Sequence, residues 1–109
     1  MFKLQRFGRH IRKFPENPGS YAVTPGIQAS VHENGVVLLH IPTGRLFQSN
    51  RTGAKIWQGL TSGLQPDVIA ADISHHYGVP QDVAVRDTAS FLTALEQHGF
   101  VARAASSQP

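Results

Sequence analysis

The sequence contains no cysteine, which excludes disulfides, thiolate catalysis and cysteine-based zinc sites and fits a reducing compartment. It also lacks any apolar run near the roughly 18 residues that a membrane span needs. No continuous apolar segment follows the basic N-terminus, so a secretory signal is not expected. The 109 residues, 40% of them apolar, predict one small domain with tails, without a membrane span and located in the cytoplasm.

Acidic residues are missing from the first 14 positions, which carry five bases: Lys3, Arg6, Arg9, Arg12 and Lys13. The remaining 95 residues hold five basic and seven acidic side chains, so the folded part is mildly acidic. The spacing of Leu4, Phe7, Ile11 and Phe14 is helical and indicates a basic amphipathic segment, although Gly8 weakens a helix there. Such a segment could touch a membrane surface, a nucleic acid or an acidic partner, or it could be a frayed tail whose aromatic residues fold back on the domain.

A catalytic constellation is also absent. The sequence has six histidines: His10, His32, His40, His75, His76 and His98. Their spacing matches no recognised metal-binding signature. The neighbours His75 and His76 point in different directions on a helix, and the carboxylates are scattered along the chain. No glycine-rich phosphate loop occurs. The sequence therefore predicts no catalytic residue, no metal site and no cofactor.

Three short strands follow a linker rich in proline, glycine and serine at residues 15–26. Residues 27–32 alternate between apolar and polar side chains, as in a half-buried strand. Residues 36–41 are nearly all apolar and predict a central strand, and residues 45–49 form the third. We expect Asn34-Gly35 to supply the positive φ values of the first hairpin, and Gly44 to take a left-handed conformation in the second.

Three helices are expected after the strands. Asn50 is a good N-cap for a helix over residues 51–62, Pro66 suits the first position of a second, and Pro80 opens the longest. The predicted apolar positions of the first two helices are Ala54, Ile56, Trp57 and Leu60, followed by Ile69, Ile73 and Tyr77. Those of the last helix are Val85, Thr88, Phe91, Leu92 and Leu95. Glycines at 63, 78 and 99 are placed to end these helices.

This order predicts an α+β, winged-helix-like fold: a three-stranded antiparallel meander followed by three helices that pack on one face of the sheet. A winged-helix DNA binder needs a basic recognition helix. The last helix has Arg86 as its one base, against Asp82, Asp87 and Glu96. DNA reading by the folded part is therefore disfavoured, although the basic tail could still bind nucleic acid without sequence preference.

The third strand has no later strand in the sequence to pair with, so its edge offers a docking place for another chain. An extended peptide could add to this edge. Alternatively, residues 15–25 could cover it, or the edge could pair with its own copy in a small dimerisation scaffold.

Several segments, taken in order, resemble the PqqD-like family over about residues 20–102. They are Val36–Ile41, Pro42–Phe47, Asn50–Trp57, Asp67–Val79 and the closing pattern of Asp87, Phe91, Leu92, Leu95, Gly99 and Phe100. The resemblance implies a non-catalytic recognition domain for ribosomally made, post-translationally modified peptides. Such a domain binds the precursor's leader peptide as an extra strand, between the third strand and the third helix. It presents the precursor to a separate enzyme, such as a radical SAM maturase or a leader peptidase.

Carried over by position, the resemblance implies one wall of a peptide site at Arg45, Leu46, Phe47, Gln48 and Ser49. The other wall is expected at Asp87, Ser90, Phe91 and Ala94, with Phe91 alternatively part of the core. The domain would span residues 20–102, between a basic extension and linker (1–19) and a disordered tail (103–109). Whether the final product is a quinone cofactor, a lasso peptide or another modified peptide stays open, as does the role of residues 1–14.

Overall fold

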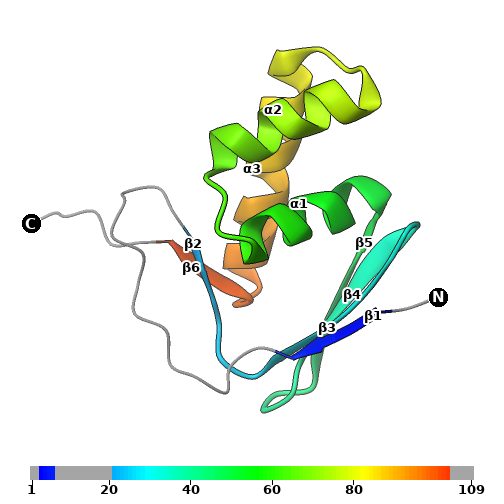
Figure 1. Ribbon diagram of the computed structural model, residues 1–109. Helices are drawn as coiled ribbons and strands as arrows, with labels where there is room; N and C mark the ends of the chain where they lie inside the picture. Colours follow the sequence, from blue (N-terminus) through cyan, green and yellow to red (C-terminus); the bar gives the residue numbers. More distant parts are fainter. Residues whose placement is uncertain (1–2, 7–20, 104–109) are drawn as a thin grey trace, which may run out of the picture.

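The computed structural model of the chain describes residues 3–6 and 21–103. The helices are α1 (Arg51–Thr61), α2 (Pro66–Tyr77) and α3 (Gln81–Gln97). The strands are β1 (Lys3–Arg6), β2 (Tyr21–Val23), β3 (Ile27–His32), β4 (Gly35–His40), β5 (Arg45–Asn50) and β6 (Val101–Arg103). Figure 1 shows the three helices gathered on one side of the sheet that contains β3, β4 and β5.

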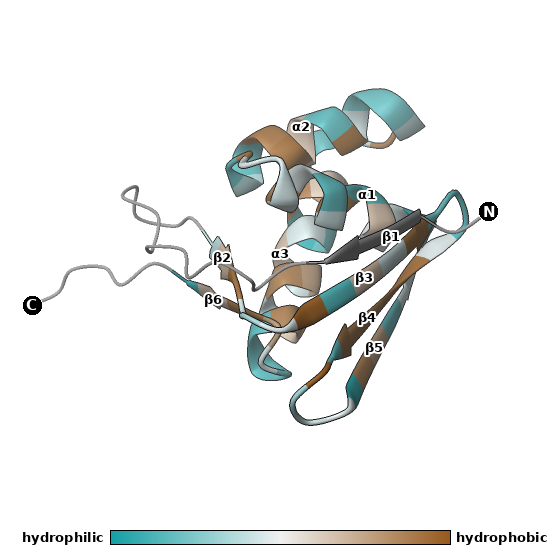
Figure 2. Cartoon of the chain, turned by 60° about the horizontal axis from the view of Figure 1, so that its bottom comes forward, coloured by the Kyte–Doolittle hydropathy of each residue, from teal (hydrophilic) through white to brown (hydrophobic). Residues whose placement is uncertain are grey.

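The predicted meander is confirmed. Strands β3, β4 and β5 pair antiparallel in chain order, with β4 in the centre, and the helices follow them. Burial alternates along β3, where Ile27, Ala29 and Val31 are buried and face the helices, and Figure 2 shows the matching change of hydropathy along the strands. In β4, Val36 and Leu38 are buried. A period of two residues places both sets on the helical face of the sheet.

The first hairpin forms at the predicted position, but the role of its glycine differs from the predicted one. No residue of the turn between β3 and β4 has a positive φ, so the predicted left-handed conformation at Asn34-Gly35 is wrong. Gly35 instead lies against the carbonyl oxygen of Ser49 on β5, and a Cβ atom would collide with this main-chain oxygen. The glycine is therefore required by the close approach of two strands. In the second hairpin, Gly44 has the predicted positive φ of 75°.

The predicted helix boundaries agree with the structure because local groups fix them. The Asn50 side chain accepts a hydrogen bond from the Gly53 N–H at 3.0 Å, which caps α1. Gly78 ends α2 with a φ of 67°, and Gly99 follows α3 with a φ of 83°. The Phe100 N–H donates to the carbonyl of Leu95, five residues earlier, at 2.8 Å. This hydrogen bond is typical of a Schellman ending.

One core joins the helices to the sheet. Its largest fully buried side chains include Trp57, Phe100, Ile27, Leu38 and Ile56. The apolar stripes predicted for α1 and α2 lie in this core or against it. The stripe predicted for α3 is wrong at one position, because Val85 is 47% exposed and its neighbour Ala84 is buried instead. Ala84 continues the helical spacing through Thr88, Leu92 and Leu95, all of which are buried.

Two pairings were not predicted. Strand β1 pairs antiparallel with β3, so the sheet has four strands in the order β1-β3-β4-β5. The helical segment indicated for residues 1–14 is therefore wrong over Lys3–Arg6; Phe7, Ile11 and Phe14 lie outside the described residues. Strands β2 and β6 form a second sheet, which extends through Arg103. The described part of the chain also excludes residues 7–20, which belong to the predicted extension and linker, and residues 104–109, which belong to the predicted tail.

The second sheet joins two segments far apart in sequence. Arg103 donates a hydrogen bond to the Tyr21 hydroxyl at 3.1 Å, and this bond, helped by the charge of Glu96, raises the pKa of the Arg103 guanidinium. The Thr24 N–H donates to the Phe100 carbonyl at 3.0 Å, which continues the pairing beyond β2. None of the three described helices has the length and apolar character that a membrane crossing requires.

Candidate functional site

Strand β5 lies at an edge of the sheet. Within residues 3–6 and 21–103, its one strand partner is β4. Strand β2 pairs with β6 and not with β5, so residues 21–23 do not cover this edge. In an antiparallel ladder, alternate main-chain groups point to opposite neighbours. Half of the N–H and C=O groups of β5 therefore point away from β4, and no other strand of the described residues pairs with them. Residues 15–20 of the predicted cover lie outside those residues.

The side chains of β5 divide between two faces. Arg45, Phe47 and Ser49 share the face toward the helices, as expected for a spacing of two residues. The Arg45 guanidinium donates to the carbonyl of His98, just after α3, at 2.8 Å. Leu46 is 61% exposed and Gln48 is also exposed, which agrees with a position on the opposite face. Of the five residues predicted on β5, three therefore face α3, and Leu46 and Gln48 contribute their main chain at the edge.

Phe47 lies at the centre of an aromatic cluster. Its ring centroid is 5.8 Å from that of Phe91, 5.6 Å from that of His98 and 5.7 Å from that of Phe100. The Phe47–Phe91 pair meets edge to face, an arrangement that aromatic rings favour. Phe100 is buried, whereas Phe47 and Phe91 are half-buried and His98 is exposed. Phe91 is thus not wholly a core residue, and the cluster reaches the surface beside the open edge.

A glycine allows this close packing at the other end of β5. Gly53 is buried in the first turn of α1, and a Cβ atom there would collide with the Ser49 side chain. The same atom would lie 2.8 Å from Cε1 of Phe91. Gly53 therefore brings α1, β5 and α3 together where a larger residue would separate them.

Helix α3 and strand β5 run in opposite directions. Arg45, at the start of β5, contacts His98 at the end of α3. Ser49, near the end of β5, and Phe91, earlier along α3, both lie against Gly53 of α1. At about 1.5 Å per helical residue, Phe91 to His98 spans about 10 Å. At about 3.3 Å per strand residue, Arg45 to Ser49 spans about 13 Å. The two elements are therefore matched in length along this surface, which we call the β5–α3 surface and define by Arg45, Phe47, Ser49, Phe91, Ala94 and His98.

The remaining predicted residues lie on α3 at varying depth. Ala94 is half-buried and falls between Phe91 and His98 on the helix. Asp87 and Ser90 are exposed, and they lie up to one turn before Phe91, toward the Asn50 end of β5. Within residues 3–6 and 21–103, neither forms a hydrogen bond or ion pair with β5. Asp87 and Ser90 therefore lie beside the β5–α3 surface and are not part of it.

Sequence reasoning missed His98 and Gly53. The glycine was detectable, because glycine is disfavoured by about 1 kcal/mol in a helix interior unless packing requires it. His98 gave no such signal, since it precedes the helix-ending Gly99 and reads as an exposed end residue. Within the described part of the chain, no group of three His, Cys, Asp or Glu side chains could hold a metal ion.

The comparisons with known proteins agree with this arrangement. Residues 35–101 match the model of the family described as coenzyme PQQ synthesis protein D (PqqD). A solved structure of TbiB1 in complex with the TbiA(beta) leader peptide is 30% identical, with a TM-score of 0.70, and covers 77% of this chain and 98% of TbiB1.

A lasso peptide synthetase B1, complexed with the leader peptide, is 31% identical with a TM-score of 0.69. That match covers 76% of this chain and 98% of the other. No curated protein matches the chain. Because the family model spans more than half of the sequence and two solved structures match nearly over their whole length, the chain belongs to the PqqD family.

Proposed function

We propose that this protein is a non-catalytic module that binds the leader of a ribosomally made precursor peptide as an additional strand on β5. The single observation that carries the proposal is the open β5 edge backed by the β5–α3 surface. The two similar solved structures support it, since both were determined with a leader peptide. The absence of cysteine fits the cytoplasm as its location.

Strand addition divides recognition into two parts. The outward main-chain groups of β5, including those of Leu46 and Gln48, supply hydrogen bonds that any peptide sequence can use. Every second peptide side chain then points toward α3, where Phe47 and Phe91 offer aromatic surface and Ser49 offers a hydroxyl. We therefore expect apolar or aromatic residues at alternate positions of the leader, and the small side chain of Ala94 leaves room for them beside Phe91.

The exposed residues at the ends of the β5–α3 surface set a second level of selectivity. Asp87 and Ser90 lie toward the Asn50 end of β5, and Arg45 lies at the other end. A leader that adds antiparallel to β5 would place its upstream residues near Asp87 and its downstream residues near Arg45. Antiparallel addition is favoured because every strand pair described in this sheet is antiparallel.

The held precursor requires a separate enzyme. Either a radical SAM maturase or a leader peptidase could act on a peptide held in this way. The similarity to lasso peptide synthetase B1 favours a leader peptidase that takes part in making lasso peptides. The module would raise the local concentration of the precursor at that enzyme, since linking two binding events makes the second effectively intramolecular.

Titration of the full chain with a fluorescent leader peptide, encoded by a short gene beside its own, tests the proposal. We expect saturable 1:1 binding with a dissociation constant between nanomolar and micromolar, about −12 to −8 kcal/mol. Amide exchange should slow at alternate residues of β5, and NMR shifts should change at Phe47 and along α3. A scrambled leader is the control. Absence of binding to any neighbouring precursor would contradict the proposal, and a concentration-dependent dimer by sedimentation would favour self-pairing of the edge.

A further inference from the structure

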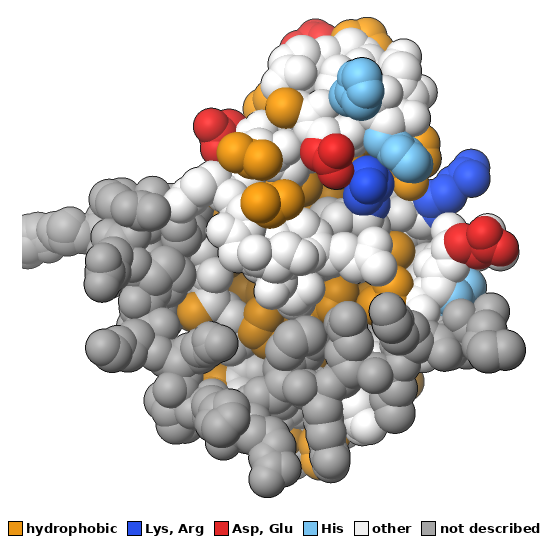
Figure 3. Space-filling view, in the orientation of Figure 1, with side chains coloured by type: hydrophobic (Ala, Val, Ile, Leu, Met, Phe, Trp, Pro, Cys, Tyr) orange, Lys and Arg blue, Asp and Glu red, His pale blue; other side chains and the backbone are white. Residues whose placement is uncertain are grey.

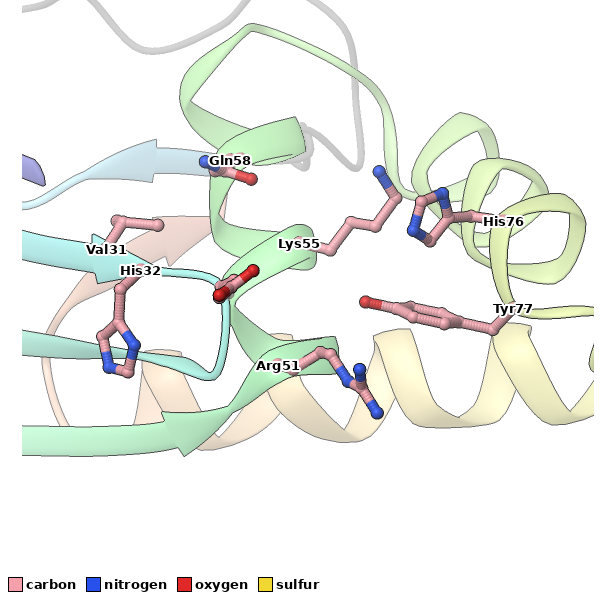
Figure 4. A pocket seen from close by; sticks show the side chains of 9 residues that line it. Val31, His32, Arg51, Lys55, Gln58, His76 and Tyr77 are labelled. Atoms are coloured by element: carbon pink, nitrogen blue, oxygen red, sulfur yellow. The ribbon is translucent and has the colours of Figure 1, made fainter. Parts of the chain in front are cut away.

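A concave surface lies on the side of α1 that faces away from the β5–α3 surface. It is a pocket of about 500 Å³ between the β3–β4 turn, α1 and the end of α2. Its polar lining includes His32, Glu33, Arg51, Lys55, His76 and Tyr77, and we call it the Arg51 pocket. Figure 4 shows Lys55 and Arg51 projecting from α1 toward His76 and Tyr77 of α2, with His32 on the strand opposite.

Helix α1 separates this pocket from the β5–α3 surface. Successive residues of a helix are turned by about 100°. Arg51, Lys55 and Gln58 therefore share one side of α1, and that side faces the pocket. Gly53 lies on roughly the opposite side and contacts Ser49 and Phe91. A peptide on β5 and a partner in the Arg51 pocket could consequently be bound at the same time.

The chemistry of the pocket favours a carboxylate. Arg51, Lys55, Gln58 and Tyr77 can all donate hydrogen bonds into it, whereas Glu33 is the one carboxylate in its lining. Lys55 is already paired with Asp72 on α2, at 3.3 Å. Figure 3 shows basic, acidic and histidine side chains gathered on this side of the molecule.

Arg51 is the charged donor of the pocket that no described carboxylate occupies. Its guanidinium carbon is 5.9 Å from the centroid of the Tyr77 ring, within the usual range of a cation–π contact. Within the part of the chain that the structure describes, no ion pair joins Arg51 to a carboxylate. The ring therefore helps to orient the guanidinium while its donors stay free for a bidentate carboxylate.

We propose that the Arg51 pocket docks the enzyme that acts on the held peptide, by accepting an acidic side chain from the surface of that enzyme. This inference rests on the proposed function, because a module that presents a peptide needs one surface for the peptide and another for the enzyme. The volume of the pocket is sufficient for an inserted side chain with its neighbours, as in other recognition pockets.

The test uses the full chain, its fluorescent leader and the peptidase or maturase encoded beside it. The Arg51→Glu substitution reverses the charge in the pocket, and an acidic residue in the first turn of α1 is compatible with the helix dipole, so the fold should persist. We expect affinity for the enzyme to fall at least about 10-fold, as for a central interface residue, and affinity for the leader to stay within about twofold.

Two matched variants sharpen the result. Arg51→Lys keeps the charge and should retain most of the enzyme affinity, and Glu33→Gln removes the pocket's own carboxylate and should not weaken it. Excess leader should not displace the enzyme. The inference is overturned if Arg51→Glu binds the enzyme as tightly as the unaltered chain, or if the unaltered chain does not bind it. Failure of the leader to bind the unaltered chain would instead contradict the proposed function.

Discussion

One edge of the four-stranded sheet is β1, a strand of four residues with lysine and arginine in its sequence, whereas the opposite edge is β5, a strand of six residues. Short and charged edge strands are a common protection against unwanted pairing. The β5 edge is longer, and α3 lies beside it with an aromatic cluster at its surface. The difference indicates that the protein protects one edge and equips the other for binding.

The largest expected effect comes from removing the aromatic centre of the β5 edge. Phe47→Ala eliminates the contacts with Phe91, His98 and Phe100, so leader affinity should fall by about 30-fold or more, as for a hot-spot residue. Fluorescence anisotropy measures this loss. Leu46→Ala, on the opposite face of the same strand, is the matched control and should change the affinity less than threefold. Equal losses in both variants would contradict a binding surface that faces α3.

The next effect concerns the joint between α1, β5 and α3. In most exposed helix positions, Gly→Ala stabilises a protein by about 1 kcal/mol. At Gly53 the added methyl group collides with Ser49 and presses on Phe91, so we expect Gly53→Ala to destabilise the fold by about 1–3 kcal/mol. Urea unfolding gives the sign directly. A gain in stability would show that the three elements are packed less closely than described.

A smaller effect is expected where the β5 edge passes into α1. Asn50 accepts a hydrogen bond from Gly53, and Asn50→Ala should lower the free energy of unfolding by about 1 kcal/mol. Asn50→Asp keeps an acceptor at the same place and should retain the stability. Thermal unfolding followed by circular dichroism compares the two, and equal losses would argue against the cap as the cause.

The smallest effect on stability is expected at the protected edge. Gln5→Pro removes a main-chain donor from the middle of β1 and should release its pairing with Ala29, at a cost below about 1 kcal/mol because the strand is short. Leader affinity should not change, but the freed β3 edge should promote self-association, visible by sedimentation at increasing concentration. Gln5→Thr keeps the donor and serves as the control. A monomeric Gln5→Pro variant would show that β1 is not needed as a protection.

The local features of the fold were predictable from the sequence because single residues determine them. Asn50, Pro66, Gly78 and Gly99 fix helix ends through their own hydrogen bonds or backbone conformation. Alternation of apolar residues identified β3, and the apolar run identified β4. The order of three strands and three helices followed from these elements and agreed with the family resemblance.

The features that were missed depend on contacts distant in sequence. The sequence of residues 3–6 contains no signal for their pairing with β3. The helical spacing of apolar residues led to the wrong prediction there. The role of Gly35 depends on the Ser49 carbonyl, which only the paired strands bring close. For the candidate site, position in the family indicated β5 and α3, but the division of β5 into Arg45, Phe47 and Ser49 on one face required the structure.

The small β2–β6 sheet has a consequence for how residues 21–103 hold together. Because Tyr21 is paired with Arg103, the two ends of this stretch lie side by side, whereas β1 belongs to the other sheet. A terminal segment stays ordered when its backbone is tied to another strand, so each of these two short strands anchors the other. A truncation that removes Val101–Arg103 would therefore also release Tyr21–Val23.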